Sequence, residues 1–437
     1  MPRVAEGEMR SPIQEDTANS IHNMSRVASL LVACAVPLSA AAFVPSMTMG
    51  RSATRTPPIV MREPKKVAVG VIGTGLVGGE LLKQIEECSA ALKDQGLEIT
   101  VASISKTRPD ADGERQPWML CDDEEGCTLE SVAAAMDDPE AGEPGDFVRM
   151  AEFLKETSPH AIIVDATASE LVSDYYPEWL AKGVNVVTPN KKAGSGDLDR
   201  WKDCVESMKA TGAQWGDETT VGAGLPILNV LRTDLLATGD KVNTIEGIFS
   251  GTLSYLFNVY EPGMKFSDVI ADAKDKGFTE PDPRDDLSGT DVARKVTILA
   301  RACGIPVDLD DVPVSSLVPD ALQDWSPKEG EVLADAFIEQ MKAFDDEKDK
   351  LVKSAEEAGN VLRFVGVVDV AAKKVSVELR QYPKTHPFAG TQYADNICAF
   401  STERYTPQPL VIQGPGAGAA VTAAGIFADV IKVAKSC

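Results

Sequence analysis

The sequence predicts an α/β protein, in which a doubly wound parallel sheet is joined to a second, α+β domain with a mixed sheet. The chain of 437 residues, of which 43% are hydrophobic, is long enough for two domains with sizeable cores. From residue 65 to residue 217, short β-branched runs alternate with helical patterns, which is typical of parallel strands joined by helices. A G-x-G-x-x-G turn connects the first of these strands to the first helix.

The glycine turn follows the predicted strand Val67–Ile72. Its first glycine permits a tight turn, the second lets the backbone approach a pyrophosphate, and the third lets the helix pack on the strand. The helix N-terminus would then face the phosphates. This context predicts a Rossmann-type dinucleotide-binding domain, and a glycine-rich turn without a ligand is the alternative. The expected cofactor contacts are Gly73, Gly75, Leu76, Val77 and Gly78.

The second predicted strand, Leu97–Ser105, runs into the residues S-K-T-R. A site for NAD usually places an acid near this point to bind the ribose 2′-hydroxyl. Two cations and two hydroxyls suit a 2′-phosphate better, so Lys106 and Arg108 favour NADP, with NAD as the alternative cofactor. Ordinary surface charge is the other interpretation of this pair. The acidic stretch 109–150 is predicted to be an insertion at the rim of the domain.

Two more predicted strands, AIIVD and VNVV, are separated by a helical pattern. Ligands of doubly wound sheets bind at the carboxyl ends of the strands. Thr167 and Lys191 each lie just past such an end, so both are expected to face the nicotinamide half of the cleft. A solvated surface charge is the alternative for Lys191.

The stretch GFTEPDPRDDLSGTDVARK, residues 277–295, gathers charges around two prolines before the chain turns apolar. The prolines are expected to exclude helix from the acidic part, and Ser288 is expected to cap a new helix. Asp291 and Lys295 are one turn apart, so they share a face of that helix. The alternative is that they form only a helix cap and its i,i+4 partner, and that the preceding acids are solvated loop.

Seven motifs of the chain resemble homoserine dehydrogenases, of the short type found in fungi that lacks an ACT regulatory extension. They are GTGLVGGELL, VDATAS, VTPNKKA, ETTVGAGLPI, GIFSGTLSYLF, the stretch 277–295 and GPGAGAAVTAAGIFADVIK. They occur in the family's order over almost all of the chain from Lys65. The glycine turn is generic, whereas the acidic stretch is highly specific. The resemblance implies reversible NAD(P)-dependent interconversion of L-homoserine and L-aspartate 4-semialdehyde, on the route to threonine and methionine.

The resemblance also implies roles for single residues. Lys295 is the acid–base lysine beside the reacting oxygen, and Lys191 is a second catalytic lysine near the nicotinamide. Glu280 binds the substrate ammonium, with Asp286 and Asp291 in the same polar network. The other implied contacts are Thr252 for the substrate, and Thr167 and Gly418 for the cofactor. These types suit the chemistry, because two nearby ammonium groups lower each other's pKa and a lysine stabilises a developing oxyanion.

The motif ETTVGAGL resembles the family's monovalent-cation site. The implied ligands are the side chain of Glu218 and the backbone carbonyls of Val221, Ala223 and Leu225. Hard oxygen ligands suit a sodium-like ion. A tight glycine-rich turn between two domains is the alternative.

The resemblance implies a discontinuous nucleotide domain, residues 65–217 plus 406–437, because the final strand, turn and helix of the family pack back on it. Residues 218–405 are then the substrate-binding and dimerisation domain, and a homodimer is expected. Two other functions are alternatives to homoserine oxidation. Aspartate-semialdehyde dehydrogenase needs a nucleophilic cysteine with a histidine partner, for which Cys303 and His160 are poorly placed. A non-catalytic NADP-binding sensor needs the glycine turn, but it does not need the two lysines and the acidic stretch that this chain also has.

Residues 1–64 are predicted to be a targeting presequence. An apolar run of about a dozen residues follows Met24 and ends in small residues, as in a secretory signal, and a basic, hydroxyl-rich segment comes next. The junction AAAFVPS resembles the cleavage motif of algal plastid presequences. The expected location is therefore the plastid stroma, with no membrane anchor in the mature form; an ordinary secretory signal or a disordered tail is the alternative.

The overall composition narrows the chemistry. The net charge of −24, from 67 acids and 43 bases, argues against a nucleic-acid partner. The eight cysteines have no C-x-x-C spacing, which favours reduced thiols over metal ligands or disulfides. With three histidines in the chain, acid–base catalysis is expected to depend on lysine or carboxylate groups.

Overall fold

Residues 63–109, 115–122, 126–138 and 141–436 are described by the computed structural model, and they contain one sheet of seven strands and one of five. The predicted presequence lies outside the described residues except for its last two positions. Parts of the acidic insertion also lie outside them.

The first sheet has the strand order β4-β3-β2-β1-β5-β6-β7, and β2, β1, β5, β6 and β7 run parallel. This arrangement confirms the predicted doubly wound parallel sheet. The acidic insertion contributes β3 and β4, which pair antiparallel at one edge. The strands are β1 (Lys65–Ile72), β2 (Leu97–Pro109), β3 (Arg115–Cys121), β4 (Glu143–Pro144), β5 (Ala161–Asp165), β6 (Asn185–Val187) and β7 (Trp215–Gly216).

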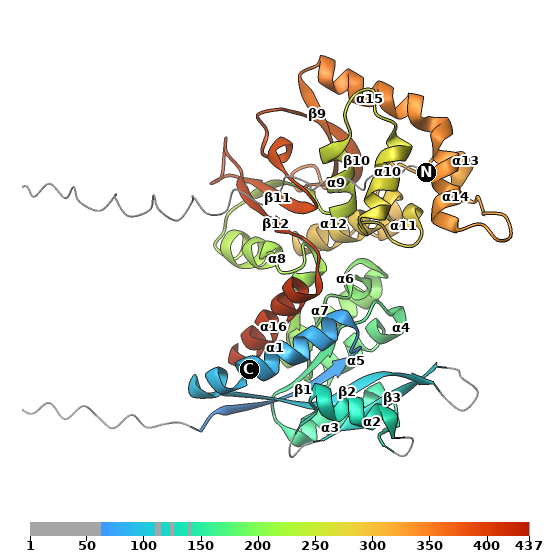
Figure 1. Cartoon of the computed structure of the whole chain (residues 1–437). Coiled ribbons are helices and arrows are strands. Elements are labelled where there is room, and N and C mark those ends of the chain that lie inside the picture. The colour runs from blue at the N-terminus through green and yellow to red at the C-terminus, as the bar shows by residue number, and fades with distance from the viewer. Residues whose placement is uncertain (1–62, 110–114, 123–125, 139–140, 437) are drawn as a thin grey trace, which may run out of the picture. The chain divides into compact units, whose positions relative to one another are not determined.

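Helices cover both faces of this sheet (Figure 1). The three valines at odd positions of β1 pack into one core with α1 and the C-terminal helix α16, whereas the even positions pack with α3 and α5. The two cores follow from the alternation of side chains along a strand buried on both faces. The helices of this part are α1 (Leu76–Asp94), α2 (Leu129–Asp137), α3 (Phe147–Thr157), α4 (Glu170–Ser173), α5 (Tyr176–Ala181), α6 (Lys191–Ser195), α7 (Leu198–Thr211) and α16 (Ala419–Ser436).

The second sheet has the order β10-β9-β8-β11-β12, and each neighbouring pair is antiparallel. The prediction of a mixed sheet here was therefore wrong, because alternating hydrophobicity locates strands without giving their direction. One face of the sheet packs against α9, α10, α12 and α15. The strands are β8 (Val242–Ile248), β9 (Asn360–Asp369), β10 (Lys374–Pro383), β11 (Asp395–Thr402) and β12 (Leu410–Pro415).

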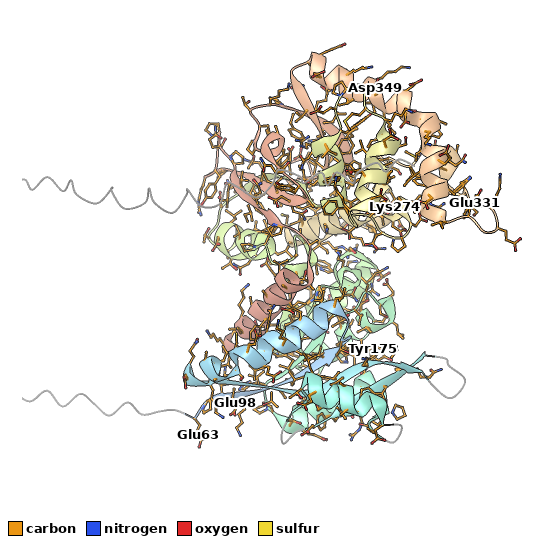
Figure 2. All side chains as sticks on the ribbon, viewed as in Figure 1. Glu63, Glu98, Tyr175, Lys274, Glu331 and Asp349 are labelled. Atoms are coloured by element: carbon orange, nitrogen blue, oxygen red, sulfur yellow. The ribbon has the colours of Figure 1, made fainter. Side chains whose placement is uncertain are left out.

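The helices of this second part include a π-helical turn that directly follows α8. They are α8 (Ile227–Asn229), the π-helix Val230–Leu236, α9 (Gly251–Val259), α10 (Phe266–Asp275), α11 (Pro283–Leu287), α12 (Thr290–Ala302), α13 (Asp320–Gln323), α14 (Leu333–Met341) and α15 (Asp345–Glu357). None of the described helices is long and apolar enough to cross a membrane. Charged side chains such as Glu63 and Glu331 are exposed (Figure 2), in keeping with the strongly acidic composition.

The chain leaves the second sheet later than the sequence predicted. β12 pairs with β11, so residues 410–415 form an edge strand of the second sheet and not part of the nucleotide domain. The part of this final segment that packs against α1 is the helix α16, as the red and blue helices of Figure 1 show. We therefore propose that the nucleotide domain comprises residues 65–217 plus 416–436, in place of the expected return at residue 406.

Candidate active site

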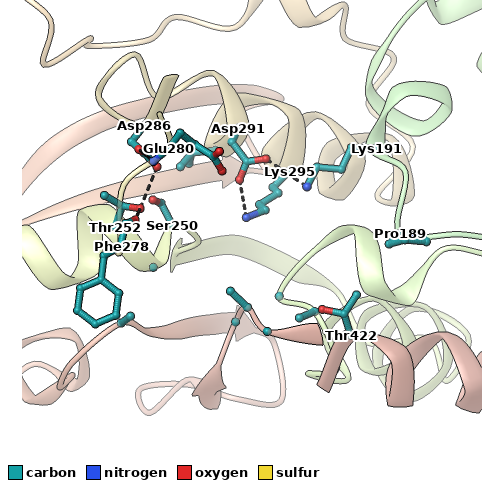
Figure 3. A pocket seen from close by; sticks show the side chains of 18 of the residues that line it. Pro189, Lys191, Ser250, Thr252, Phe278, Glu280, Asp286, Asp291, Lys295 and Thr422 are labelled. Carbon is teal, nitrogen blue, oxygen red and sulfur yellow. Dashed lines mark hydrogen bonds and ion pairs between the residues drawn. The ribbon is translucent and has the colours of Figure 1, made fainter. Parts of the chain in front are cut away.

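A cavity of about 780 Å³ is lined by residues from both sheet-containing parts of the chain (Figure 3). It brings together all six of the residues predicted for catalysis and substrate binding. These are Lys191, Thr252, Glu280, Asp286, Asp291 and Lys295, together with Val77 and Gly418 of the predicted cofactor contacts.

Helix α12 places Asp291 in its first turn and Lys295 one turn later. The apolar face of α12 packs into the core beneath the second sheet, so Lys295 is only 7% exposed. Its Nζ lies 2.6 Å from Oδ2 of Asp291 and donates a hydrogen bond of 2.6 Å to the carbonyl oxygen of Phe249. The buried ammonium is therefore held by one charge and one dipole.

Helix α6 brings the second lysine to the same carboxylate. Asn190 caps this short helix by accepting the backbone N–H of Lys192, and the helix begins at Lys191. The Nζ of Lys191 lies 3.2 Å from Oδ1 of Asp291. Asp291 thus bridges two ammonium groups that come from different parts of the chain (Figure 3).

The surroundings of the two lysines shift the pKa of the groups between them. Burial lowers the pKa of Lys295, the charge of Asp291 raises it, and the charge of Lys191 lowers it again, with a net lowering from the ordinary value. Burial would raise the pKa of Asp291, but the charges of Lys295 and Lys191 hold it well below its usual range. The arrangement pairs a permanent anion with a lysine that is disposed to exchange a proton.

At the other end of the cavity lies a group of oxygen atoms. Asp286 accepts the backbone N–H of Glu280 at 2.8 Å, and its second oxygen lies 2.8 Å from the hydroxyl of Thr252. Burial raises the pKa of Asp286. The side chain of Glu280 lines the cavity and its residue is exposed, so the carboxylate is open to a ligand.

Two local predictions for the acidic stretch were wrong. A short helix, α11, lies within it, because Pro283 occupies the first helical position, where a missing N–H is tolerated, and Asp282 caps that helix. Ser288 does not cap α12, since the N-cap residue is Gly289, which has a φ of 76°. A positive φ at this position favours glycine, and the following helix still presents Asp291 and Lys295 on one face.

A second cavity of about 560 Å³ adjoins the glycine turn and is lined by Gly73, Gly75, Lys106 and Thr167, among others. Gly73 has a φ of 88°, and a Cβ on Gly78 would lie 2.0 Å from the Gly73 carbonyl oxygen, so both positions require glycine. These contacts agree with the roles predicted for a dinucleotide turn.

The turn also leaves room for a ligand. A Cβ on Gly75 would meet no atom within 4 Å, and the buried Oγ1 of Thr74 has no hydrogen-bond partner among the described residues. The residues present therefore fit a dinucleotide. Of the other predicted cofactor contacts, Leu76 is 88% exposed, and the side chain of Arg108 lies outside the described part of the structure.

The predicted cation ligand Glu218 has clear structural partners. Its two carboxylate oxygens accept the backbone N–H groups of Leu228 and Asn229, each at 2.7 Å. Burial, and then the charge of Asp429, raise its pKa to about 7. The carbonyl of Leu225 accepts the N–H of Ile227, which leaves an oxygen lone pair for an ion. Among the described residues, no three His, Cys, Asp or Glu side chains gather as metal ligands.

Several cavity residues were missed by sequence reasoning. Ser250 and Gly416 line the cavity and belong to motifs that were recognised, so inspection of whole motifs could have found them. Pro189, Phe278 and Thr422 also line the cavity, and they too belong to recognised motifs, namely VTPNKKA, the stretch 277–295 and GPGAGAAVTAAGIFADVIK.

Two family models match the chain. One, described as homoserine dehydrogenase, NAD binding domain, matches residues 73–216, and the other, described as homoserine dehydrogenase, matches residues 226–431. A homoserine dehydrogenase of Schizosaccharomyces pombe is 43% identical over 84% of this chain and 95% of the relative. The chain belongs to the homoserine dehydrogenase family. A chloroplastic bifunctional aspartokinase/homoserine dehydrogenase of Arabidopsis thaliana is 48% identical over 84% of this chain. The chain spans 39% of the length of that relative.

Solved structures agree with the family and the fold. A crystal structure of a Candida auris protein of unknown function is 38% identical, with a TM-score of 0.76 over 85% of this chain and 99% of that chain. A hyperthermophilic archaeal homoserine dehydrogenase in complex with NADPH is 24% identical, with a TM-score of 0.61 over 85% of this chain and 98% of that chain. The second likeness concerns the fold alone.

Proposed function

We propose that this chain catalyses the NAD(P)-dependent interconversion of L-homoserine and L-aspartate 4-semialdehyde, within the biosynthesis of threonine and methionine. The observation that carries the proposal is the bridge of Lys191, Asp291 and Lys295 in a cavity whose other end holds carboxylates. Family membership supports the same reaction, and the zwitterionic substrate matches the charges of the cavity.

Each of these residues has a separate role in the proposed reaction. Glu280 and Asp286 receive the ammonium of homoserine, and Thr252 supports Asp286 through its hydroxyl. A nicotinamide cofactor held at the glycine turn of Gly73, Gly75 and Gly78 would supply the hydride chemistry. Lys295, as a neutral amine, takes the proton of the hydroxyl as the carbonyl forms, and returns it in the reverse reaction. Lys191 stabilises negative charge on the same oxygen.

Alternative functions have less support from the site. Burial raises the pKa of Cys303 to about 12, which is unsuited to the thiolate nucleophile of an aspartate-semialdehyde dehydrogenase. A non-catalytic NADP-binding sensor would have no use for two bridged lysines opposite an acidic loop.

One assay separates these functions. The protein from Lys65 onward is mixed with homoserine and with NADP⁺ or NAD⁺, and absorbance is followed at 340 nm. The proposed enzyme produces reduced cofactor in proportion to homoserine, whereas a sensor binds the cofactor without a signal. An aspartate-semialdehyde dehydrogenase would produce a signal from aspartate semialdehyde and phosphate but none from homoserine.

We further propose NADP as the preferred cofactor. Lys106 lines the cavity beside the glycine turn, where it can meet a 2′-phosphate, and the archaeal relative was solved with NADPH. Replacing this lysine removes one charge-assisted contact, so Lys106→Ala should raise the KM for NADP⁺ about tenfold and leave that for NAD⁺ unchanged. Lys83→Ala, which changes an exposed lysine of α1, is the matched control. Equal effects on the two cofactors would contradict the preference.

A monovalent cation, with sodium as the first candidate, is proposed at Glu218 and the carbonyls of Val221, Ala223 and Leu225. The support is a pair of buried acids that share one cation: Asp429 lies beside Glu218, Lys432 lies within 3.2 Å of Asp429 and 3.9 Å of Glu218, and burial raises the pKa of both carboxyls. A cation there would stabilise the junction of the two parts without entering the chemistry. Its test is thermal unfolding in NaCl and in choline chloride at equal ionic strength, where identical midpoints would count against the site.

Assembly and location are proposed on similar grounds. The homodimer expected from the sequence is proposed through the second sheet; the apolar residues on its face opposite the helices, Ile248, Val365, Val367 and Ile397, are already buried within the single chain and offer no free surface themselves. Light scattering of the purified protein would give the mass of the assembly, and a monomer would exclude it. The plant relatives are named as chloroplastic, which supports plastid location, and a fluorescent fusion of residues 24–64 found outside the plastid would exclude that targeting.

A further inference from the structure

Asp165 is a buried carboxylate that lines neither cavity in the described part of the chain, yet it connects to both. It is the last residue of β5, at the carboxyl end of the first sheet, and its side chain is fully buried. A buried carboxylate is stable only when its oxygens are well supplied with donors. The identities of those donors indicate what this residue does.

Four donors converge on the carboxylate, two on each oxygen. Oδ1 accepts the backbone N–H of Thr167 at 2.8 Å and the hydroxyl of the same residue at 2.6 Å. Oδ2 accepts the hydroxyl of Tyr176 at 2.7 Å and Nδ2 of Asn190 at 2.8 Å. One side chain therefore ties the loop after β5 to the loop after β6.

Each of these loops carries part of the proposed active site. Thr167 lines the cavity beside the glycine turn, where a cofactor contact is expected. Asn190 is the N-cap of α6, and its Oδ1 accepts the N–H of Lys192 at 3.0 Å while its Nδ2 is held by Asp165. The direction of the Asn190 side chain thus determines where α6 begins and where Lys191 stands.

We propose that Asp165 is the positioning residue that sets the cofactor loop and the Lys191 loop in one fixed relation. This inference rests on the proposed function, because it assigns Asp165 to the placement of groups for that reaction. Asp165 acts through Thr167 and Asn190 and touches neither substrate nor cofactor. Catalysis requires reacting groups to be held within a fraction of an ångström, which this shared carboxylate provides.

An asparagine cannot replace this aspartate, although it has the same shape. In one orientation its amide N–H₂ would face the N–H of Thr167, a backbone donor that cannot be reversed. In the other orientation it would face Nδ2 of Asn190, which cannot turn over without losing the cap of α6. Either way two donors oppose each other at a buried position, so one of the two loops must move.

The test uses Asp165→Asn in the otherwise unaltered chain, with folding checked by urea unfolding. NADPH affinity is measured by fluorescence, and kcat and KM for homoserine by absorbance. We expect the NADPH Kd to rise or kcat to fall by at least about tenfold, the equivalent of one charge-assisted hydrogen bond. Tyr176→Phe is the matched control, because it removes one donor to the same carboxylate, together with a contact to the hydroxyl of Thr188, while the hydrogen bonds from Thr167 and Asn190 stay in place. It should keep both values within about threefold.

A double-mutant cycle with Lys191→Ala distinguishes positioning from general destabilisation. If Asp165 acts through the lysine, the factor by which Lys191→Ala lowers kcat should be smaller in the Asp165→Asn protein than in the unaltered chain, by about tenfold or more. Asn190→Ser offers a second route if Asp165→Asn fails to fold, because serine keeps the cap but loses the donor to Asp165. It should lower kcat and keep NADPH affinity within about threefold, because the second hydrogen bond it loses goes to the backbone carbonyl of Ser169 and leaves the bonds from Thr167 to Asp165 in place.

Additive losses in the cycle, or unchanged kcat and Kd in a folded Asp165→Asn protein, would overturn the proposal. A chain that oxidises no homoserine would refute the proposed function instead. In that case NADPH binding by the Asp165→Asn protein still tests whether Asp165 positions the Thr167 loop. An unchanged Kd would then overturn the inference as well.

Discussion

Replacing Lys295 with alanine should abolish most turnover while leaving the fold and cofactor binding intact. The proposed proton transfer loses its donor and acceptor. General acid–base catalysis contributes roughly 10²–10⁴-fold to a rate, so kcat should fall by this factor. That loss corresponds to about 3–5 kcal/mol of the activation barrier.

The structure explains why the fold should survive this change. The carbonyl of Phe249, which accepts from Lys295, also accepts Nδ2 of Asn396 at 3.2 Å. Asp291 keeps its ion pair with Lys191. No partner of Lys295 is therefore left without a donor, and the buried ammonium is removed together with its methylenes. We expect the free energy of unfolding to change by no more than about 2 kcal/mol.

The assay is steady-state oxidation of homoserine with NADP⁺, beside NADPH binding and urea unfolding of the same protein. Lys192→Ala is the matched control, because this neighbouring lysine of α6 pairs with Glu170 and lies outside the lining of the cavity as described. A folded Lys295→Ala protein that keeps kcat within about threefold of the unaltered chain would refute the catalytic role, since the expected loss is far larger.

Three further results follow from the same geometry. Oxidation requires the neutral amine of Lys295, so kcat/KM should rise with pH through its lowered pKa. The charge of Asp291 raises that pKa, so Asp291→Asn should move the midpoint of the pH profile to lower pH. The charge of Lys191 lowers it, so Lys191→Met should move the midpoint to higher pH. Shifts of both variants in the same direction would contradict the assignment. A Cβ on Gly78 would overlap the carbonyl oxygen of the first glycine of the turn, so Gly78→Ala should weaken NADPH binding at least about tenfold by calorimetry, whereas Gly79→Ala, whose Cβ has its nearest neighbour at 3.9 Å, should bind normally.

Local chemistry explains which parts of the site could be predicted from the sequence. The pairing of Asp291 with Lys295 follows from their spacing on one helix, and the glycine turn follows from the strand and helix around it. The carboxyl ends of parallel strands also placed Thr167 and Lys191 at the correct edge of the sheet. In each case a short-range rule specified the position.

Long-range relations could not be obtained in this way. The meeting of Lys191 with Asp291 depends on how two distant segments pack, and the antiparallel order of the second sheet leaves no trace in hydrophobic alternation. The position of Pro283 shows the same difficulty at short range, because proline both ends helices and begins them. Asp165 was overlooked because its importance lies in four donor groups, two of which come from the distant residues Tyr176 and Asn190.

The distribution of charge along the cavity bears on substrate choice. Figure 3 shows Glu280 and Asp286 toward one end, Lys191 toward the other, and Asp291 with Lys295 between them. A zwitterionic substrate entering this field is oriented with its ammonium at the carboxylates, which leaves its alcohol to reach the lysines. An amino acid with a shorter side chain would satisfy the ammonium site and fail to bring its hydroxyl to Lys295. Under the proposed function, we therefore expect the separation of the two charged ends, more than the affinity of either, to select the length of the alcohol that is oxidised.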